Sequence, residues 1–107
     1  MQSDALTQFV IDKIDDMKGR DIITIDVKEK SSFTDFMAVC SGNSNKHVQS
    51  IAKHIALEAK SNDSEPLGIE GLDVGEWCLI DLGSVVVHVM TDASRDLYEL
   101  EKLWGDI

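Results

Sequence analysis

Apolar residues recur at two different spacings along the chain, and these spacings predict its helices and strands. Near the N-terminus, a spacing of three and four residues predicts a helix that Ser3 or Asp4 can cap and that Gly19 ends. A second helix is predicted for residues 46–60, after a turn in which Asn43 or Ser44 can act as the cap. The apolar faces of these two helices are formed by Leu6, Phe9, Val10, Ile14 and Met17 and by Val48, Ile51, Ala52, Ile55 and Ala59.

Five short segments, most of them rich in β-branched or aromatic residues, predict strands. They cover residues 21–27, 36–40, 67–70, 76–82 and 85–90, and the last two form a hairpin across residues 82–84. Residues 36–40 are almost continuously apolar, which is typical of a strand that is buried on both faces. The polar segments at residues 28–34 and 61–66 are predicted to be loops.

A last helix is predicted from residue 92 or 94 to residue 104. Within it, Arg95 can pair with Glu99 one turn further on or with another nearby carboxylate. Its buried stripe is formed by Leu97, Leu100 and Trp104. The order of all these elements predicts one α/β domain over residues 1–107, in which a mixed sheet of about five strands is flanked by helices.

The acidic residues gather in the second half of the chain. Residues 61–107 contain eleven Asp and Glu but only Arg95 and Lys102, whereas residues 1–60 are nearly balanced, in a chain with a net charge of −10. This segregation indicates an acidic face that suits a basic partner, although a solvated face that only favours solubility is the simpler alternative. The negative charge disfavours direct binding to DNA or RNA, because phosphates are repelled.

The chain carries no sign of a membrane, a disulfide or a metal. No apolar run is long enough to cross a membrane and the N-terminus has no signal-peptide pattern, so we expect a cytoplasmic protein. Cys40 and Cys78 each lie in an apolar run and are predicted to be buried, reduced thiols. His47 and His54 are two helical turns apart, too far to share a metal without ligands between them. We therefore expect neither a metal nor a cofactor.

The turn from Ser41 to Ser44 is the one segment that suggests an enzyme. A turn with Gly and Ser between a strand and a helix can bind phosphate through backbone N–H groups and the helix dipole. A metal-dependent nucleotidyltransferase also needs two acidic residues one position apart on a neighbouring strand. No predicted strand carries such a pair, since Asp81 stands alone. An ordinary strand-to-helix turn is the favoured interpretation, and the chain is not expected to be an enzyme.

Trp77 begins a predicted strand among acidic residues, where a large aromatic side chain can anchor a protein interface. Strand alternation places Leu79 and Asp81 on the same face and leaves the more apolar opposite face for the core. His88 interrupts an apolar strand and is either a hydrogen-bonded core histidine or part of a sheet face that meets a partner. No nucleophile is marked beside it, which disfavours catalysis.

A set of residues spread over most of the chain forms a pattern that is specific in its order and spacing, although each piece alone is weak. The set comprises Asp21, Ile22, Asp26, Val27, Ser32, Thr34, Asp35, Phe36, Cys40, Ser41, Gly42, Asn43, Ser44, His47, Val48, Glu70, Gly71, Trp77, Asp81, Leu82, Gly83, Val87, His88, Val89, Arg95, Tyr98, Glu99, Leu100, Glu101, Leu103 and Trp104. In this pattern the chain resembles the ribosomal silencing factors, also called the Iojap-related family.

This resemblance implies a fold related to the nucleotidyltransferases but without their catalytic carboxylates. It also implies binding to the fourteenth protein of the large ribosomal subunit, on the surface that meets the small subunit. The resemblance further implies that occupying that surface blocks subunit joining and lowers translation when nutrients are scarce, and that the protein is dimeric when free of the ribosome. Face, charge and resemblance together predict these contact residues: Glu70, Asp73, Glu76, Trp77, Leu79, Asp81 and His88.

Two other interpretations of the sequence stay open at this point. One is a metal-dependent nucleotidyltransferase that uses the turn from Ser41 to Ser44 to hold phosphate. The other is a homodimeric scaffold with no ribosomal role, in which the acidic half of the chain serves solubility alone.

Overall fold

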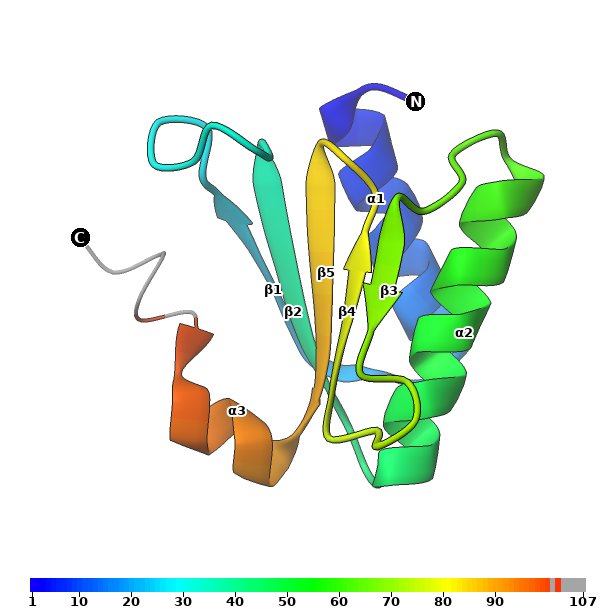
Figure 1. The fold of residues 1–107 in the computed structure, drawn as a ribbon, viewed down its shortest axis with the longest axis vertical. Helices are drawn as coiled ribbons and strands as arrows, with labels where there is room; N and C mark the ends of the chain where they lie inside the picture. Colours follow the sequence, from blue (N-terminus) through cyan, green and yellow to red (C-terminus); the bar gives the residue numbers. More distant parts are fainter. Residues whose placement is uncertain (101, 103–107) are drawn as a thin grey trace.

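The predicted helices and strands are all present, in the predicted order, in the computed structural model (Figure 1). The structure describes residues 1–100 and 102. Apart from the end of the last helix, the boundaries lie within a few residues of the predicted ones. The elements are α1 (Ser3–Asp16), β1 (Arg20–Asp26), β2 (Phe36–Gly42), α2 (Asn45–Ser61), β3 (Gly68–Glu70), β4 (Trp77–Asp81), β5 (Val85–Thr91) and α3 (Asp92–Tyr98).

The five strands form one mixed sheet in the order β1-β2-β5-β4-β3. The central strands β2 and β5 are parallel and pair from Phe36 opposite Val85 to Gly42 opposite Thr91, whereas the other neighbours are antiparallel. Every β2 residue after Phe36 is buried, which confirms the prediction for this strand. Because β2 and β5 point the same way, the helices that follow them both begin at the same end of the sheet.

The two faces of the sheet carry different helices (Figure 1). α1 and α2 lie on one face, where Ile14, Ile51 and Ile80 are among the fully buried residues of the main core. α3 lies on the other side of the sheet. We call this second side the α3 face, and its smaller apolar cluster comprises Ile25, Val27, Met37, Val39, Met90 and Leu100, with Trp77 packed against it.

The ends of α1 differ from the prediction. Gln2, rather than Ser3 or Asp4, is the N-cap residue, and its side chain makes no capping hydrogen bond. At the other end, Lys18 and not Gly19 adopts the left-handed conformation, with a φ of 61°. Gly19 is needed for a different reason, because a Cβ atom there would lie 2.4 Å from a side-chain carbon of the last turn of α1.

The start of α2 is fixed by two side chains. Oγ of Ser44 accepts a hydrogen bond from the backbone N–H of His47 at 3.0 Å, which confirms Ser44 as the cap. The imidazole of His47 accepts at Nδ1 from the backbone N–H of Asn43 and donates from Nε2 to the carbonyl of Met17, over 2.8 and 2.7 Å. This ring therefore joins the turn before α2 to the end of α1.

Replacing Ser44 by alanine should lower the free energy of unfolding by about 1 kcal/mol, because the first turn of α2 loses its capping acceptor. Urea denaturation followed by circular dichroism measures this change. Ser50→Ala is the matched control, since the Ser50 hydroxyl donates to the carbonyl of Lys46 within the same helix and does not cap its first turn. A loss in Ser44→Ala no larger than in Ser50→Ala would contradict the capping role.

The last helix is shorter than predicted. α3 ends at Tyr98, and the next residue, Glu99, adopts a left-handed conformation with a φ of 49°. As a result Leu97 and Leu100 do not share a buried stripe: Leu97 is 74% exposed, whereas Leu100 is buried. The third member of the predicted stripe, Trp104, lies outside the described residues.

Arg95 ties α3 to the end of the central strand β2. Its guanidinium donates from Nη1 to Oγ of Ser41 over 2.9 Å, and both residues are buried. The carboxylate of Glu99, which the sequence suggested as a partner for Arg95, lies 3.0 Å from Nζ of Lys102. The position of α3 is therefore set by a contact between this helix and strand β2 and not only by pairs on the helix surface.

Both cysteines are free and buried, as predicted. Burial raises the pKa of the Cys40 thiol to about 12, since an apolar environment disfavours the thiolate. In the described part of the chain, no helix is both long enough and apolar enough to span a bilayer.

Candidate protein-binding face

Alternate residues of β3, β4 and β5 bring five of the predicted contact residues onto the α3 face. In the sheet register, Glu70 lies opposite Leu79, and Leu79 lies opposite His88. Trp77 and Asp81 lie on β4 two residues before and after Leu79, and therefore on the same face. We call these five residues the Trp77 patch.

Trp77 is half-buried and is held on two sides. Its indole Nε1–H donates a hydrogen bond to Nδ1 of His88 over 2.9 Å, and the two ring centroids are 5.8 Å apart. On another side, its ring centroid lies 4.6 Å from that of Tyr98, which ends α3. An aromatic ring that is anchored in this way and still partly open to solvent suits a protein interface.

His88 lies beneath the surface of the patch. It is 5% exposed, so in the free protein a predicted contact residue is covered by its neighbours. Burial lowers the pKa of His88 to about 4, because an apolar environment disfavours the imidazolium. Of the two interpretations that the sequence left open, the structure supports a buried histidine whose ring is hydrogen-bonded.

Acidic side chains lie on the same sheet face as Trp77. Glu70 is exposed, and Leu79 and Asp81 are partly exposed. The Asp81 carboxylate also accepts a hydrogen bond from the backbone N–H of Gly83 over 2.9 Å, so it shapes the turn between β4 and β5. An aromatic residue with a partly apolar surround and an acidic rim is complementary to a basic partner surface.

The close approach of the loop after β3 to Trp77 requires glycine at position 71. Gly71 has a φ of 83°, a backbone conformation that residues other than glycine rarely adopt. A Cβ atom at this position would lie 2.1 Å from the carbonyl oxygen of Trp77. Any side chain here would therefore push apart the two segments that carry Glu70 and Trp77.

Two of the predicted contact residues lie away from this patch. The Asp73 carbonyl accepts a hydrogen bond from the side chain of Gln49 on α2. The Cys78 thiol has a raised pKa, chiefly through burial and secondarily through the Asp73 carboxylate, so Asp73 faces the side of α2. Glu76 is exposed, directly precedes β4 and borders a hollow at the end of the sheet.

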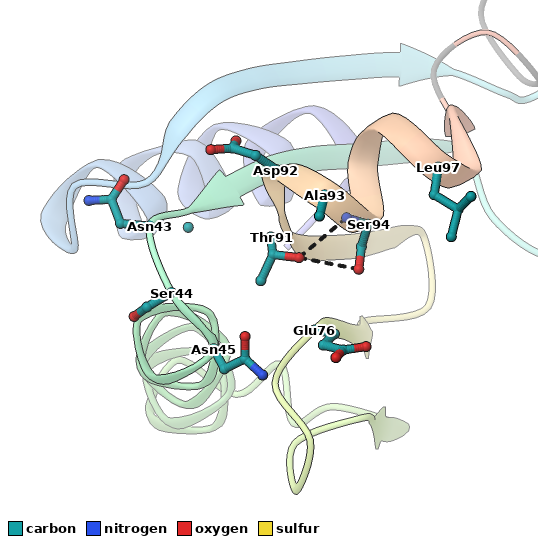
Figure 2. Close-up of a pocket in the computed structure, with 10 residues that line it drawn as sticks. Asn43, Ser44, Asn45, Glu76, Thr91, Asp92, Ala93, Ser94 and Leu97 are labelled. Carbon is teal, nitrogen blue, oxygen red and sulfur yellow. Dashed lines mark hydrogen bonds between the residues drawn. The ribbon is translucent and has the colours of Figure 1, made fainter.

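That hollow, of about 500 Å³, is open to solvent and lies where β2 and β5 end (Figure 2). The first residues of α2 and α3 line it, together with Glu76 and Leu97. Asp92 on its border pairs with Nη2 of Arg20 over 2.9 Å, and Nε of Arg20 donates to the side chain of Asn43 over 2.6 Å. The turn from Ser41 to Ser44 that suggested an enzyme leads into this hollow.

Two acidic residues, Glu76 and Asp92, line the hollow. The exposed carboxylate of Glu76 disfavours a bound phosphate, whereas the carboxylate of Asp92 is paired with Arg20. Over residues 1–100 and 102, no group of three or more His, Cys, Asp or Glu side chains could hold a metal ion.

Leu97 and Tyr98 are exposed apolar residues of α3 that the sequence reasoning missed. Tyr98 is 51% exposed and extends the Trp77 patch through its ring contact. The sequence placed Leu97 in a buried stripe because it predicted an unbroken helix to residue 104. The break at Glu99 has no sequence signal, since left-handed helix ends usually carry Gly or Asn.

The whole chain matches one protein family. The family described as "Ribosomal silencing factor during starvation" matches residues 1–107. The ribosomal silencing factor RsfS of Haemophilus influenzae is 41% identical over 101 residues, which cover 94% of this chain and 99% of that one. The ribosomal silencing factor RsfS of Bacillus subtilis is 45% identical over 92 residues, which cover 86% of this chain and 78% of that one.

The fold agrees with these sequence comparisons. A crystal structure of a protein from Chromobacterium violaceum matches with a TM-score of 0.96 at 39% identity, over 98% of this chain and 88% of that one. Fold and comparisons together define the class, which is a small α/β regulatory factor of the ribosome. Because this family matches the entire chain, residues 1–107, the chain belongs to the ribosomal silencing factor family.

Proposed function

We propose that this chain represses translation when nutrients are limiting, by binding the large ribosomal subunit through its fourteenth protein and blocking the joining of the two subunits. The family supports this proposal, and the observation that carries it on the molecule is the Trp77 patch. The Trp77 ring is fixed by His88 on an accessible sheet face that also carries Glu70 and Asp81. Ribosomal proteins are basic because they bind RNA, so this face complements them while bare RNA is repelled.

Repression of this kind requires position and size rather than chemistry. The domain measures 36 × 31 × 21 Å, and a body of these dimensions on the intersubunit surface occupies space that the other subunit needs. No covalent step is involved, so no catalytic group or cofactor is required. The extent of repression then follows from the fraction of large subunits that carry the protein, and thus from its affinity and concentration.

The same family resemblance leads us to propose a cytoplasmic protein that forms a homodimer when it is free of the ribosome. Sedimentation equilibrium measures the mass of the free protein directly. A mass twice that of the 107-residue chain is expected, and a single-chain mass over the whole concentration range would remove the dimer from the proposal. The ribosomal role does not depend on this outcome.

The central experiment mixes purified small and large subunits with and without the protein and follows their joining on a sucrose gradient. We expect the subunits to stay apart and the protein to sediment with the large one. Higher salt should weaken this association, because it screens exposed charges. Normal joining with the protein left at the top of the gradient would overturn the proposal and favour a scaffold without a ribosomal role.

A further inference from the structure

The Trp77 indole has a single hydrogen-bond donor, and the protein itself uses it. Nε1–H points to Nδ1 of His88 at 2.9 Å, a normal length for a nitrogen–nitrogen hydrogen bond between neutral rings. A partner that meets Trp77 therefore finds the surface of the ring and not a free N–H group. Aliphatic side chains and the stems or charged ends of Lys and Arg are the groups that pack on such a surface.

The acceptor comes from a residue that the sheet holds in place. His88 lies in the middle of β5, opposite Leu79, while Trp77 lies opposite Met90. Trp77 and His88 are thus diagonal neighbours on one face, close enough for two large side chains to meet. Because β5 is a central strand and His88 is 5% exposed, its ring has little freedom to move.

The protonation state of the His88 imidazole suits its role as the acceptor for the Trp77 indole N–H. Nδ1 can accept from an indole N–H only when it carries no proton, so the proton of the neutral ring is on Nε2. Burial lowers the pKa of His88 to about 4, which keeps the ring neutral at physiological pH. An imidazolium would instead place a second N–H against that of the indole.

The ring of Tyr98 restricts the movement of the Trp77 indole from the side of α3. The ring centroids of Tyr98 and Trp77 are 4.6 Å apart, with 44° between the ring planes. α3 itself is held by the backbone N–H of Ser94, which donates to the capping hydroxyl of Thr91, and by Arg95, which donates to the hydroxyl of Ser41. The indole is therefore set by a strand on one side and by a helix on another.

We propose that His88 is a positioning residue: it accepts the hydrogen bond of the Trp77 indole and thereby fixes the orientation of that ring. Together with Tyr98, it presents the indole already ordered to an apolar or basic side chain of the partner. This rests on the proposed function, since it assigns the partner contact to the Trp77 patch. Without the acceptor, binding must order the indole, and ordering one large side chain costs a factor of about three to ten in affinity. His88 thus acts through Trp77 and does not itself touch the partner.

Two substitutions separate positioning from simple packing. In His88→Asn, the side-chain oxygen stands at the position of Nδ1 and can still accept the bond. In His88→Leu, a side chain of roughly similar volume offers no acceptor. Nitrogen-15 spectra of the free protein resolve the indole N–H of Trp77, which a Trp77→Phe spectrum assigns, and binding to purified large subunits gives the dissociation constant.

We expect the Trp77 indole N–H to exchange slowly with solvent in the wild type and in His88→Asn, and at least about tenfold faster in His88→Leu. The dissociation constant should rise about three- to tenfold in His88→Leu and stay within about twofold in His88→Asn. Unchanged exchange and unchanged affinity in His88→Leu would overturn the proposal. If His88→Leu does not fold, His88→Phe replaces it, and fast exchange in the wild type overturns the proposal without any variant.

The two proposals fail in different ways. If the wild type does not bind large subunits but the indole N–H responds to the acceptor as expected, the ribosomal partner is wrong and the positioning of Trp77 stands. If the wild type binds and the indole N–H is indifferent to the residue at position 88, the positioning role is wrong and the ribosomal partner stands.

Discussion

Replacing Trp77 by alanine should weaken binding to the large ribosomal subunit by about 30-fold or more, which corresponds to ~2 kcal/mol. The expected loss is large because Trp77 is the largest side chain of the Trp77 patch and is already held by His88 and Tyr98 before binding. Its removal takes away contact area and leaves the partner surface facing a gap. Co-sedimentation or biolayer interferometry with purified large subunits measures the dissociation constant.

The matched control for this variant is Leu57→Ala. Leu57 is 63% exposed on α2, on the opposite side of the sheet. Its replacement by alanine therefore removes an exposed apolar group far from the Trp77 patch. Its affinity should remain at the wild-type value. A thermal melt of both variants checks that they are folded, since Trp77 also packs against the smaller apolar cluster. An affinity of Trp77→Ala within about twofold of the wild type would remove the anchor role.

The second large effect is a loss of stability in acid that comes from His88. The imidazole titrates near 6.5 in the unfolded chain and near 4 in the folded protein, where burial disfavours its charge and lowers its pKa. Between these values the unfolded chain binds a proton that the folded protein does not, so acid favours unfolding. The contribution of neutral His88 to the free energy of unfolding is fully present above about pH 6.5. About 3 kcal/mol of it is lost as the pH falls to 4.

Carboxylates also titrate in this range, so the measurement must be a difference between two proteins. His88→Asn removes the titrating group and keeps an acceptor for Trp77. Urea denaturation at pH 7 and at pH 4 gives the free energy of unfolding of both, and the wild type should lose ~3 kcal/mol more than His88→Asn between the two. Equal losses in the two proteins would show that His88 is not held neutral by the fold.

The sequence pattern was sufficient to predict local structure wherever one strong physical preference acts alone. The continuous apolar run of β2 has no alternative to burial on both faces, and Ser44 has the side chain and the place of a helix cap. The pattern was insufficient where a residue accepts a conformation that its type does not favour. Lys18 and Glu99 both adopt positive φ values, and tertiary packing rather than local propensity sets them.

In the candidate site, too, the sequence predicted some features and not others. Alternation along β4 placed Trp77, Leu79 and Asp81 on one face, since the period of a strand is fixed. Alternation cannot say what covers a face, so it left open whether His88 was buried. Nor could it place Asp73, because the loop that carries it is held by a hydrogen bond to Gln49 on a distant helix.

The parallel pairing of β2 and β5 has a consequence for the order in which a newly made chain can fold. Phe36 pairs with Val85, so the centre of the sheet joins segments about fifty residues apart in the sequence. During synthesis, α1, β1, β2 and α2 leave the ribosome before the strand that completes their core exists. Folding must then wait for residues 85–91, as expected for non-local strand pairing. The sheet of this chain can therefore be completed only after residue 91 has left the ribosome.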